Sequence, residues 1–372
     1  MSAESPAVAS PSSVGGHKRP KSPGGSPARE AKKAKKKRYQ PDGTVTDDLV
    51  PGHCVADVAK AVEAAEQSER IAGHVRVLSW NVDGWRSKFG KPDKAKDMQA
   101  VLAAEQADVV CFQETKIQDV HVPEVREALK KMGYPNSWFA TSGPPARRGY
   151  SGVAVATKAG LKPLSVTIGI GECDAEGRAI TIELPGCFIV NTYVPNSGMK
   201  LARLDYRVQS WDVAMKAYLH GLQQRKPVVW LGDLNVANHD MDIYTPSTKA
   251  DKSPGFTYRE RDSFKESLAS LEMVDAWRHA HPKLRQYTFF TSFGNSRARN
   301  NGWRLDYTVV SRSLMPSVVD TFVRGHAPHS DHVPIGIVLK DVLQDGTHAT
   351  LPAATTGATV AAAAASSPTA EA

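Results

Sequence analysis

The stretch 227-PVVWLGDLN-235 decides how the rest of the chain is interpreted, because its apolar run leads directly into a carboxylate, Asp233, and an amide, Asn235. The apolar part has the length of a buried β-strand. Two earlier segments, 75-VRVLSWNV-82 and 108-DVVCFQET-115, pass from apolar to polar residues in the same way. Ligand sites in α/β proteins gather at strand ends, where loops hold polar groups on a rigid base. The pattern therefore predicts an α/β protein with a site at its strand ends.

Short apolar runs alternate with helical stretches through the middle of the chain, and antiparallel hairpins are mixed with βα units. This alternation predicts an α/β fold with mixed sheets. The expected strands are 75–82, 108–115, 152–158, 179–184, 187–194, 227–235, 287–291, 305–311 and 333–340. The expected helices are 93–106, 123–132, 201–222 and 259–271.

The formal charge of +8 on this 372-residue chain is concentrated near the N-terminus. Residues 1–45 hold ten Lys or Arg and three acids, whereas residues 341–372 hold three acids and neither Lys nor Arg. Few large apolar residues occur at either end. We therefore expect residues 1–74 to be a disordered basic extension and residues 341–372 a disordered low-complexity tail. Residues 75–340 then form one domain, and a helix over 55–73 ahead of it stays open.

Two basic clusters, Lys18–Arg19 and 32-KKAKKKR-38, resemble a bipartite nuclear-localisation signal and predict a nuclear protein. The alternative is a solubilising tail, or one that adds non-specific affinity for DNA. No apolar run reaches the roughly 18 to 20 residues of a membrane span, and the N-terminus lacks an apolar signal core. We therefore expect neither membrane insertion nor secretion. The four cysteines are scattered without zinc-ligand spacing, which favours a reducing compartment.

Polar side chains follow several of the expected strands. They are Asn81, Asp83, Gln113, Glu114, Asn191, Tyr193, Asn196, Asp233, Asn235, Asp306 and the run Ser330–Asp331–His332. The carboxylates among them would repel one another unless a cation lay between them. Oxygen ligands without cysteine favour Mg²⁺, with Mn²⁺ as the alternative.

Each of these groups also has a structural interpretation. Asp83 fits a turn, Glu114 a solvated acid, and Asp233 a helix cap. A buried Asp306 that orients His332 would be a catalytic arrangement, but a hydrogen-bonded core histidine is nearly as common. Spacing alone leaves both interpretations open.

A set of short motifs occurs in order along residues 75–340. They are 79-SWNVDGWR-86, 112-FQETK-116, 150-YSGVAV-155, 192-TYVPNSG-198, 203-RLDYR-207, 232-GDLNVA-237, 255-GFT-257, 302-GWRLDY-307 and 330-SDH-332. Together they closely resemble the exonuclease III class of apurinic/apyrimidinic endonucleases, near its eukaryotic nuclear members. A wider superfamily of magnesium phosphodiesterases shares the acidic motifs, whereas TYVPNSG and GWRLDY are more specific to the DNA-repair class.

The resemblance implies a four-layer α/β sandwich of the DNase I-like type, in which two mixed sheets pack face to face with helices outside. It implies hydrolysis of the phosphodiester 5′ to an abasic site, leaving a 3′-hydroxyl, with 3′-phosphodiesterase and 3′–5′ exonuclease activities. The implied Mg²⁺ ligands, direct or supporting, are Asn81, Asp83, Glu114, Asp233, Asn235, Asp331 and His332. The implied catalytic residues are Tyr193, Asp233, Asn235, Asp306 and His332.

Substrate recognition is also carried over from the resemblance. Phe289, Trp303 and Leu305 match positions that line a pocket for the base-free sugar, with ordinary core aromatics as the alternative. Asn196 matches a phosphate contact, and Arg86, Lys88, Lys116 and Tyr150 are further candidates for contacts to the DNA backbone. Met199 and Phe293 stand where some members carry an arginine and a methionine that wedge into the duplex. A Phe293 side chain folded back onto the core is the alternative.

Two further functions stay open. One is a related phosphodiesterase that acts on lipid or inositol phosphates, which shares the metal residues but should lack the abasic pocket. The other is a non-catalytic DNA-binding regulator, for which broken catalytic positions would be expected. The principal expectation is a monomeric nuclear enzyme that acts on double-stranded DNA containing abasic sites, alongside other repair proteins and without a membrane.

Overall fold

A computed structural model of the protein describes residues 55–171 and 174–344. The basic clusters and most of both expected tails lie outside these residues. The boundaries at 75 and 340 need correction. Helix α1, Val58–Glu66, lies within the expected disordered extension, is capped by Asp57 and buries Ala61 and Ala65. At the other end, Val342 is buried and its carbonyl accepts a hydrogen bond from the Gly186 N–H.

Helices and strands alternate as the sequence predicts. The helices of the described residues are α1 Val58–Glu66, α2 Trp85–Lys88, α3 Pro92–Glu105, α4 Val122–Lys131, α5 Asp212–Gln223, α6 Pro246–Lys249, α7 Tyr258–Ser270 and α8 Ala276–Ala280. The strands are β1 Val75–Asn81, β2 Val109–Gln113, β3 Asn136–Ala140, β4 Val153–Thr157, β5 Ser165–Ile168, β6 Ala179–Glu183, β7 Phe188–Tyr193, β8 Val228–Asp233, β9 Met273–Asp275, β10 Asp306–Ser311, β11 Val318–Val323 and β12 Ile335–Leu339.

The strands form two six-stranded mixed sheets. The first has the order β11-β12-β1-β2-β4-β3 and the second the order β5-β6-β7-β8-β10-β9. In the first sheet β1 runs parallel to β2 and antiparallel to β12. In the second sheet β8 runs parallel to β7 and antiparallel to β10. Each sheet thus contains one parallel pair at its centre, and the polar residues at the carboxyl ends of that pair lie at one edge.

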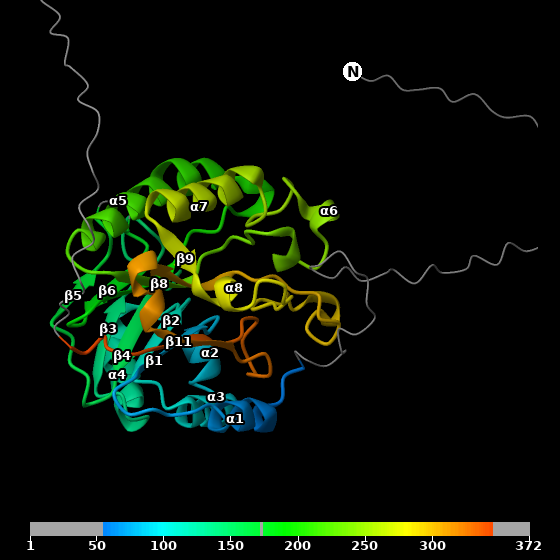
Figure 1. Cartoon of the computed structure of the whole chain (residues 1–372). Coiled ribbons are helices and arrows are strands. Elements are labelled where there is room, and N and C mark those ends of the chain that lie inside the picture. The colour runs from blue at the N-terminus through cyan, green and yellow to red at the C-terminus, as the bar shows by residue number, and fades with distance from the viewer. Residues whose placement is uncertain (1–54, 172–173, 345–372) are drawn as a thin grey trace, which may run out of the picture. The chain divides into compact units, whose positions relative to one another are not determined.

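The main core lies between the two sheets, where Val77, Val155 and Ile337 of one sheet pack with Ile189 and Leu231 of the other. A second apolar layer joins the first sheet to α1, α3 and α4, and a third joins the second sheet to α5 and α7. Figure 1 shows α5 and α7 on one side of the sheets and α1 and α3 on the other. The expected four-layer α/β sandwich is therefore confirmed.

The expected strand at 287–291 is wrong. Phe289 makes only isolated bridges, to Trp303 and to His332, and the N–H of Phe290 bonds to the Asp331 carbonyl. Residues 287–291 therefore connect the segments around Trp303 and His332 and do not form a strand of either sheet. The sequence analysis also missed four strands, β3, β5, β9 and β11, each of which lies at the edge of a sheet.

The expected helix 201–222 begins later than predicted. Lys200 and Leu201 adopt positive φ angles of 54° and 60°, which break a helix at that point. The chain then forms a π-helical turn over Tyr206–Trp211 before α5. No helix among the described residues combines the length and apolar character needed to cross a membrane.

Candidate active site

The ends of β1, β2 and β8 meet between the two sheets. Asn81, the last residue of β1, is fully buried, and its Nδ2 donates to Glu114 Oε1 at 3.1 Å and to Asp233 Oδ2 at 2.9 Å. Glu114 follows β2 with a positive φ of 49°, which turns its side chain out of the ladder. One amide thus joins carboxylates from opposite sheets. The structure brings together the three strand-end groups on which the sequence analysis depended.

Glu114, Asp233 and His332 form a group able to hold a metal ion, since one ligand atom from each lies within 4.8 Å of the others. Two of the three donors are carboxylates, which are hard oxygen ligands. Asp83 and Asp331 lie outside this group of three. The donor set therefore fits a divalent cation.

Two lysines neutralise the outer part of this acidic group. Lys116 Nζ lies 2.7 Å from Asp83 Oδ1 and 2.8 Å from Glu114 Oε2, and Lys88 Nζ lies 2.9 Å from Asp83 Oδ2. Burial opposes the ionised forms of both acids. Lys116 and Lys88 outweigh it at Asp83, and Lys116, His332 and the Asn81 amide outweigh it at Glu114, so the pKa of each acid is lowered. The two lysines expected to contact DNA thus bind the acids of the site in this structure.

His332 is held at both ends of its ring. Its Nδ1 lies 2.7 Å from Asp306 Oδ2 and its Nε2 lies 3.7 Å from Asp233 Oδ2. Burial disfavours the imidazolium, yet Asp306 and Asp233 outweigh it and raise the pKa of His332 well above its usual value. The Trp80 indole donates to the His332 carbonyl at 3.3 Å. Asp306 and His332, whose contact spacing alone left open, therefore meet, and a charged His332 would present an N–H toward an anion.

Asp233 is the least compensated acid of the group. Burial raises its pKa, the Asp306 and Glu114 carboxylates add to the increase, and His332 opposes it. Its Oδ1 accepts from the Asn235 N–H at 3.0 Å. Asn235 is held in turn by Val194, whose carbonyl accepts from Nδ2 at 2.8 Å.

Asp331 and Asn196 lie at the margin of the site. Burial, together with the nearby Asp83 and Glu114, raises the pKa of the half-buried Asp331. Asn196, expected to contact phosphate, donates from Nδ2 to Asn235 Oδ1 at 2.9 Å.

Tyr193 lies beneath the acids at the end of β7. Burial raises its pKa far above 10.0, and Glu114 and Asp233 contribute. Arg178 lies fully buried against its ring, with Cζ 4.7 Å from the ring centroid, and Nη1 donates to the Tyr193 carbonyl at 2.9 Å. The hydroxyl of Tyr150 accepts from Arg178 and from Arg203, both at 3.2 Å. The sequence analysis missed Arg178, because nothing in the strand pattern indicates a cation behind this tyrosine.

An apolar cluster lies next to His332. The rings of Phe289 and His332 are 4.9 Å apart, and Phe289, Trp303 and Leu305 pack together with Phe256. Gly302 permits the close packing of the 287–290 segment, because a Cβ there would lie 2.5 Å from the Phe290 ring and 2.8 Å from the Phe289 carbonyl oxygen. The three residues matched to the sugar pocket are thus assembled beside the histidine.

Two apolar side chains lie in loops outside this cluster. Met199 is 85% exposed and Phe293 is 83% exposed. The alternative in which Phe293 folds back onto the core is therefore wrong. Arg86, on α2, is also exposed.

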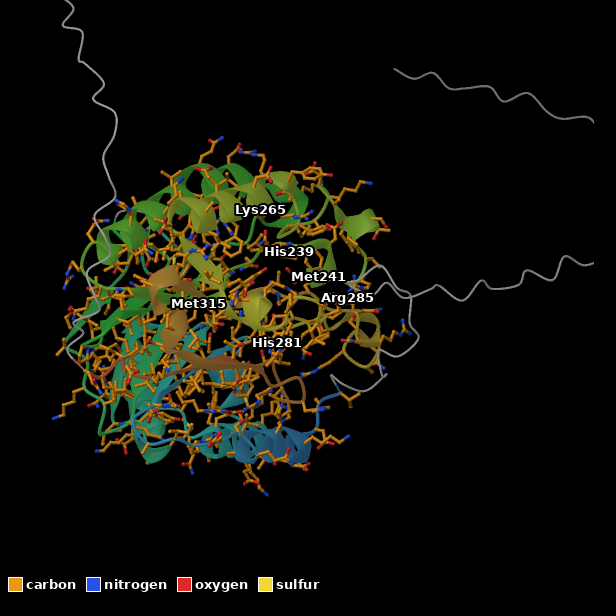
Figure 2. The ribbon with its side chains drawn as sticks, viewed as in Figure 1. His239, Met241, Lys265, His281, Arg285 and Met315 are labelled. Atoms are coloured by element: carbon orange, nitrogen blue, oxygen red, sulfur yellow. The ribbon has the colours of Figure 1, made fainter. Side chains whose placement is uncertain are left out.

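A separate buried ion cluster contains Arg304, which lies between Trp303 and Leu305 of the apolar cluster. Asp242 accepts from Arg304 Nε at 2.8 Å, from Arg304 Nη2 at 3.0 Å and from Arg278 Nη2 at 2.5 Å. Burial works against its charge, but the two arginines lower the pKa of Asp242 to about 2. His239 and Met241, labelled in Figure 2, precede it in the chain. The sequence analysis missed this cluster, although Arg304 lies within the GWRLDY motif.

The chain is similar to known proteins in sequence and in fold. A family model described as the Endonuclease/Exonuclease/phosphatase family matches residues 78–332. A DNA-(apurinic or apyrimidinic site) endonuclease of Dictyostelium discoideum is 40% identical over 289 residues, which cover 76% of this chain and 76% of that protein. The DNA repair nuclease APEX1 of Danio rerio is 42% identical over 271 residues, covering 72% of this chain and 83% of that protein.

Among solved structures, an AP endonuclease from Leishmania major aligns with a TM-score of 0.64 and 31% identity, covering 81% of this chain and 97% of that one. The chain therefore belongs to the Endonuclease/Exonuclease/phosphatase family. The relatives confirm the resemblance to apurinic/apyrimidinic endonucleases that the motifs predicted.

Proposed function

We propose that this protein is a Mg²⁺-dependent endonuclease of DNA base excision repair, which hydrolyses the phosphodiester 5′ to an abasic site and leaves a 3′-hydroxyl. The observation that carries the proposal is the apolar cluster of Phe289, Trp303 and Leu305 beside His332, which itself lies next to the metal-binding group. Acids alone would suit any phosphodiesterase of this family. An apolar surface next to them suits a sugar that has lost its base. The same site would trim blocked 3′ ends and act as a 3′–5′ exonuclease.

Glu114 and Asp233 would hold Mg²⁺, together with the Asn81 amide that bonds to both of them. Asp83 and Asp331 would be outer ligands, and Mn²⁺ would be able to replace Mg²⁺. When bound, the ion would stabilise the negative charge that develops on the phosphate and the leaving oxygen. Asp233, with its raised pKa, would orient or deprotonate the attacking water, and the Asn235 N–H fixes its carboxylate.

His332 would donate a hydrogen bond to the scissile phosphate. Its bond to Asp306 fixes the direction of the ring, so Nε2 faces the acids. A preorganised cationic donor aimed at a developing charge typically contributes about a hundredfold or more to the rate. Tyr193 would supply a hydroxyl near the phosphate, held from behind by Arg178.

DNA would be bound from the loops around the site. Arg86, Tyr150 and Asn196 would contact the backbone, and the Nζ of Lys116 would be available to a phosphate after Mg²⁺ replaced it at the acids. The exposed side chains of Met199 and Phe293 would enter the duplex beside the abasic gap. The basic N-terminal residues 1–45 support a nuclear location and added affinity for DNA. We propose a monomer that works with other repair proteins.

The test is incision of a duplex that carries one abasic analogue, with and without Mg²⁺, compared with the undamaged duplex and with a phospholipid and an inositol phosphate. We expect Mg²⁺-dependent incision 5′ to the analogue and little hydrolysis of the other substrates. Preferential hydrolysis of the lipid or inositol phosphate would replace the proposal with the related phosphodiesterase. Binding without hydrolysis of any substrate would favour the non-catalytic regulator.

A further inference from the structure

Arg297 binds the backbone of a neighbouring loop. It lies half-buried in the segment 291–301, which we call the 291–301 loop. Its guanidinium donates to three carbonyls: Nη1 to Ser330 at 3.2 Å, and Nη2 to Gly325 at 2.9 Å and to Ala327. Its Cζ also lies 5.8 Å from the centroid of the Phe290 ring. One side chain therefore joins three points of a second loop.

That second loop, residues 324–334, connects β11 to β12 and carries Asp331 and His332. Its residue Ser330 is tied directly to the site. The Ser330 hydroxyl donates to the Asn81 carbonyl at 2.6 Å and accepts from the His332 N–H at 3.1 Å. Arg297 thus binds the peptide carbonyl of the residue whose side chain holds both His332 and Asn81.

A second hydrogen bond between the same segments runs beside this one. The Phe290 N–H, just before the 291–301 loop, donates to the Asp331 carbonyl at 2.8 Å. The neighbouring segment therefore binds two consecutive carbonyls, those of Ser330 and Asp331, directly before His332. That segment also carries Phe289 against the His332 ring and the exposed Phe293.

We propose that Arg297 is a positioning residue, which aligns His332 and Asp331 with the acids of the site by fixing the backbone at Ser330. The reason for an arginine is geometric. A planar guanidinium offers several N–H donors in fixed directions, whereas a lysine ammonium on a flexible stem cannot reproduce that fork. Loss of the fork would leave the loop folded but free to shift by fractions of an ångström, which is enough to reduce turnover. This inference rests on the proposed function for its kinetic part.

The experiment compares Arg297→Met and Arg297→Lys with Arg299→Met. Arg299 is an exposed arginine of the same loop, so its replacement removes the same charge without touching the 324–334 loop. Incision of an abasic duplex gives kcat and KM, thermal melting gives stability, and NMR of ring-labelled histidine in the metal-free protein reports on His332. We expect kcat to fall about tenfold in both Arg297 variants, the scale for residues that orient catalytic groups, with KM within about twofold. The His332 resonances should shift in both Arg297 variants and stay in place in Arg299→Met.

Three results would overturn the inference. A raised KM with unchanged kcat would make Arg297 a direct DNA contact. Equal kinetic effects in the Arg297 and Arg299 variants would indicate a general effect of charge. A lower melting temperature with normal kcat and unshifted His332 resonances would make its role purely structural. If the wild-type protein does not incise abasic DNA, the proposed function fails, and the histidine spectrum still decides whether Arg297 positions His332.

Discussion

Two buried aspartates show opposite electrostatic environments in one domain. Asp242 and Asp233 are 0% and 1% exposed, so burial disfavours the charge of both. Asp242 is bound by Arg304 and Arg278, and its pKa falls to about 2. Asp233 is bound by amides and faces His332 at 3.7 Å, and its pKa is raised.

The difference separates a structural acid from a functional one. Permanent guanidinium groups satisfy Asp242, which leaves it no capacity for a further cation. Asp233 shares its surroundings with Glu114 and Asp306, and burial together with these two acids outweighs the opposing effect of His332 on its pKa. A group of under-compensated carboxylates is where an external cation gains most, and such perturbed groups concentrate at functional sites.

The largest expected effect is on stability at Asp242. Asp242→Asn would remove the anion that Arg304 and Arg278 share and leave Arg304 with Asp275 alone, at 2.8 Å. Breaking a buried pair in this way typically costs about 3 to 5 kcal/mol. Denaturant unfolding measures this loss. The control is Asp240→Asn, whose side chain is 66% exposed and paired with Arg261, and for which a change below about 1 kcal/mol is expected. Equal losses in the two variants would contradict the structural assignment of Asp242.

The second prediction concerns Asp233, where a substitution should reduce activity and leave stability almost unchanged. Asp233→Asn should reduce single-turnover incision about a hundredfold or more, because the carboxylate acts on the attacking water. Its free energy of unfolding should stay within about 1 kcal/mol of the wild type, the net value of one altered hydrogen bond. Near-normal incision, or a loss of unfolding free energy as large as that in Asp242→Asn, would contradict the distinction between a functional Asp233 and a structural Asp242.

The third prediction concerns pH. The pKa of an aspartate in an unfolded chain is about 3.9. The pKa of Asp242 in the folded protein is about 2. Because the folded value is lower, the ion pair contributes its stability above about pH 4 and loses it as the pH falls toward about 2, by about 2 to 3 kcal/mol. Carbon-13 NMR of the side-chain carboxyl should show a titration midpoint near the lower value. A titration midpoint at or above that of an unfolded aspartate would contradict the lowered pKa of Asp242.

The fourth prediction concerns Phe293, whose side chain is exposed, in contrast to the buried Asp242 and Asp233. Phe293→Ala should weaken binding of an abasic duplex by about 1 to 3 kcal/mol, the range for stacking of a base on an aromatic ring. Stability should change little, because Phe293 is 83% exposed. Leu164→Ala, at a site 61% exposed whose backbone N–H bonds to Glu183 at the end of β6 away from the active site, should alter neither quantity. Unchanged affinity for abasic DNA in Phe293→Ala would exclude a wedge at this position.

The sequence predicted well those parts that depend on local pattern. The long apolar runs of β1 and β8 are unambiguous, and their polar ends do meet. The four strands that were missed are three to six residues long and lie at sheet edges, where burial imposes no clear alternation. The segment 287–291 has strand-like residues, but tertiary contacts with Trp303 and His332 determine its conformation.

Contacts between distant segments could not be predicted from spacing. Lys116 lies two residues after Glu114 and pairs with it, but its second partner, Asp83, belongs to another strand end. The contact of Arg178 with Tyr193, and the contact of Arg297 with the 324–334 loop, depend on how strands and loops are placed in space. Their sequence surroundings are those of ordinary surface arginines.

The most direct test of the central contrast is calorimetric titration of Mg²⁺ into the wild type, Glu114→Gln and Asp240→Asn. The wild type and Asp240→Asn should bind Mg²⁺ with equal, saturable affinity, whereas Glu114→Gln should bind at least about tenfold more weakly, because a carboxylate ligand is lost. Equal Mg²⁺ affinity in the wild type and Glu114→Gln would contradict the claim that Glu114, together with Asp233 and His332, forms the metal site.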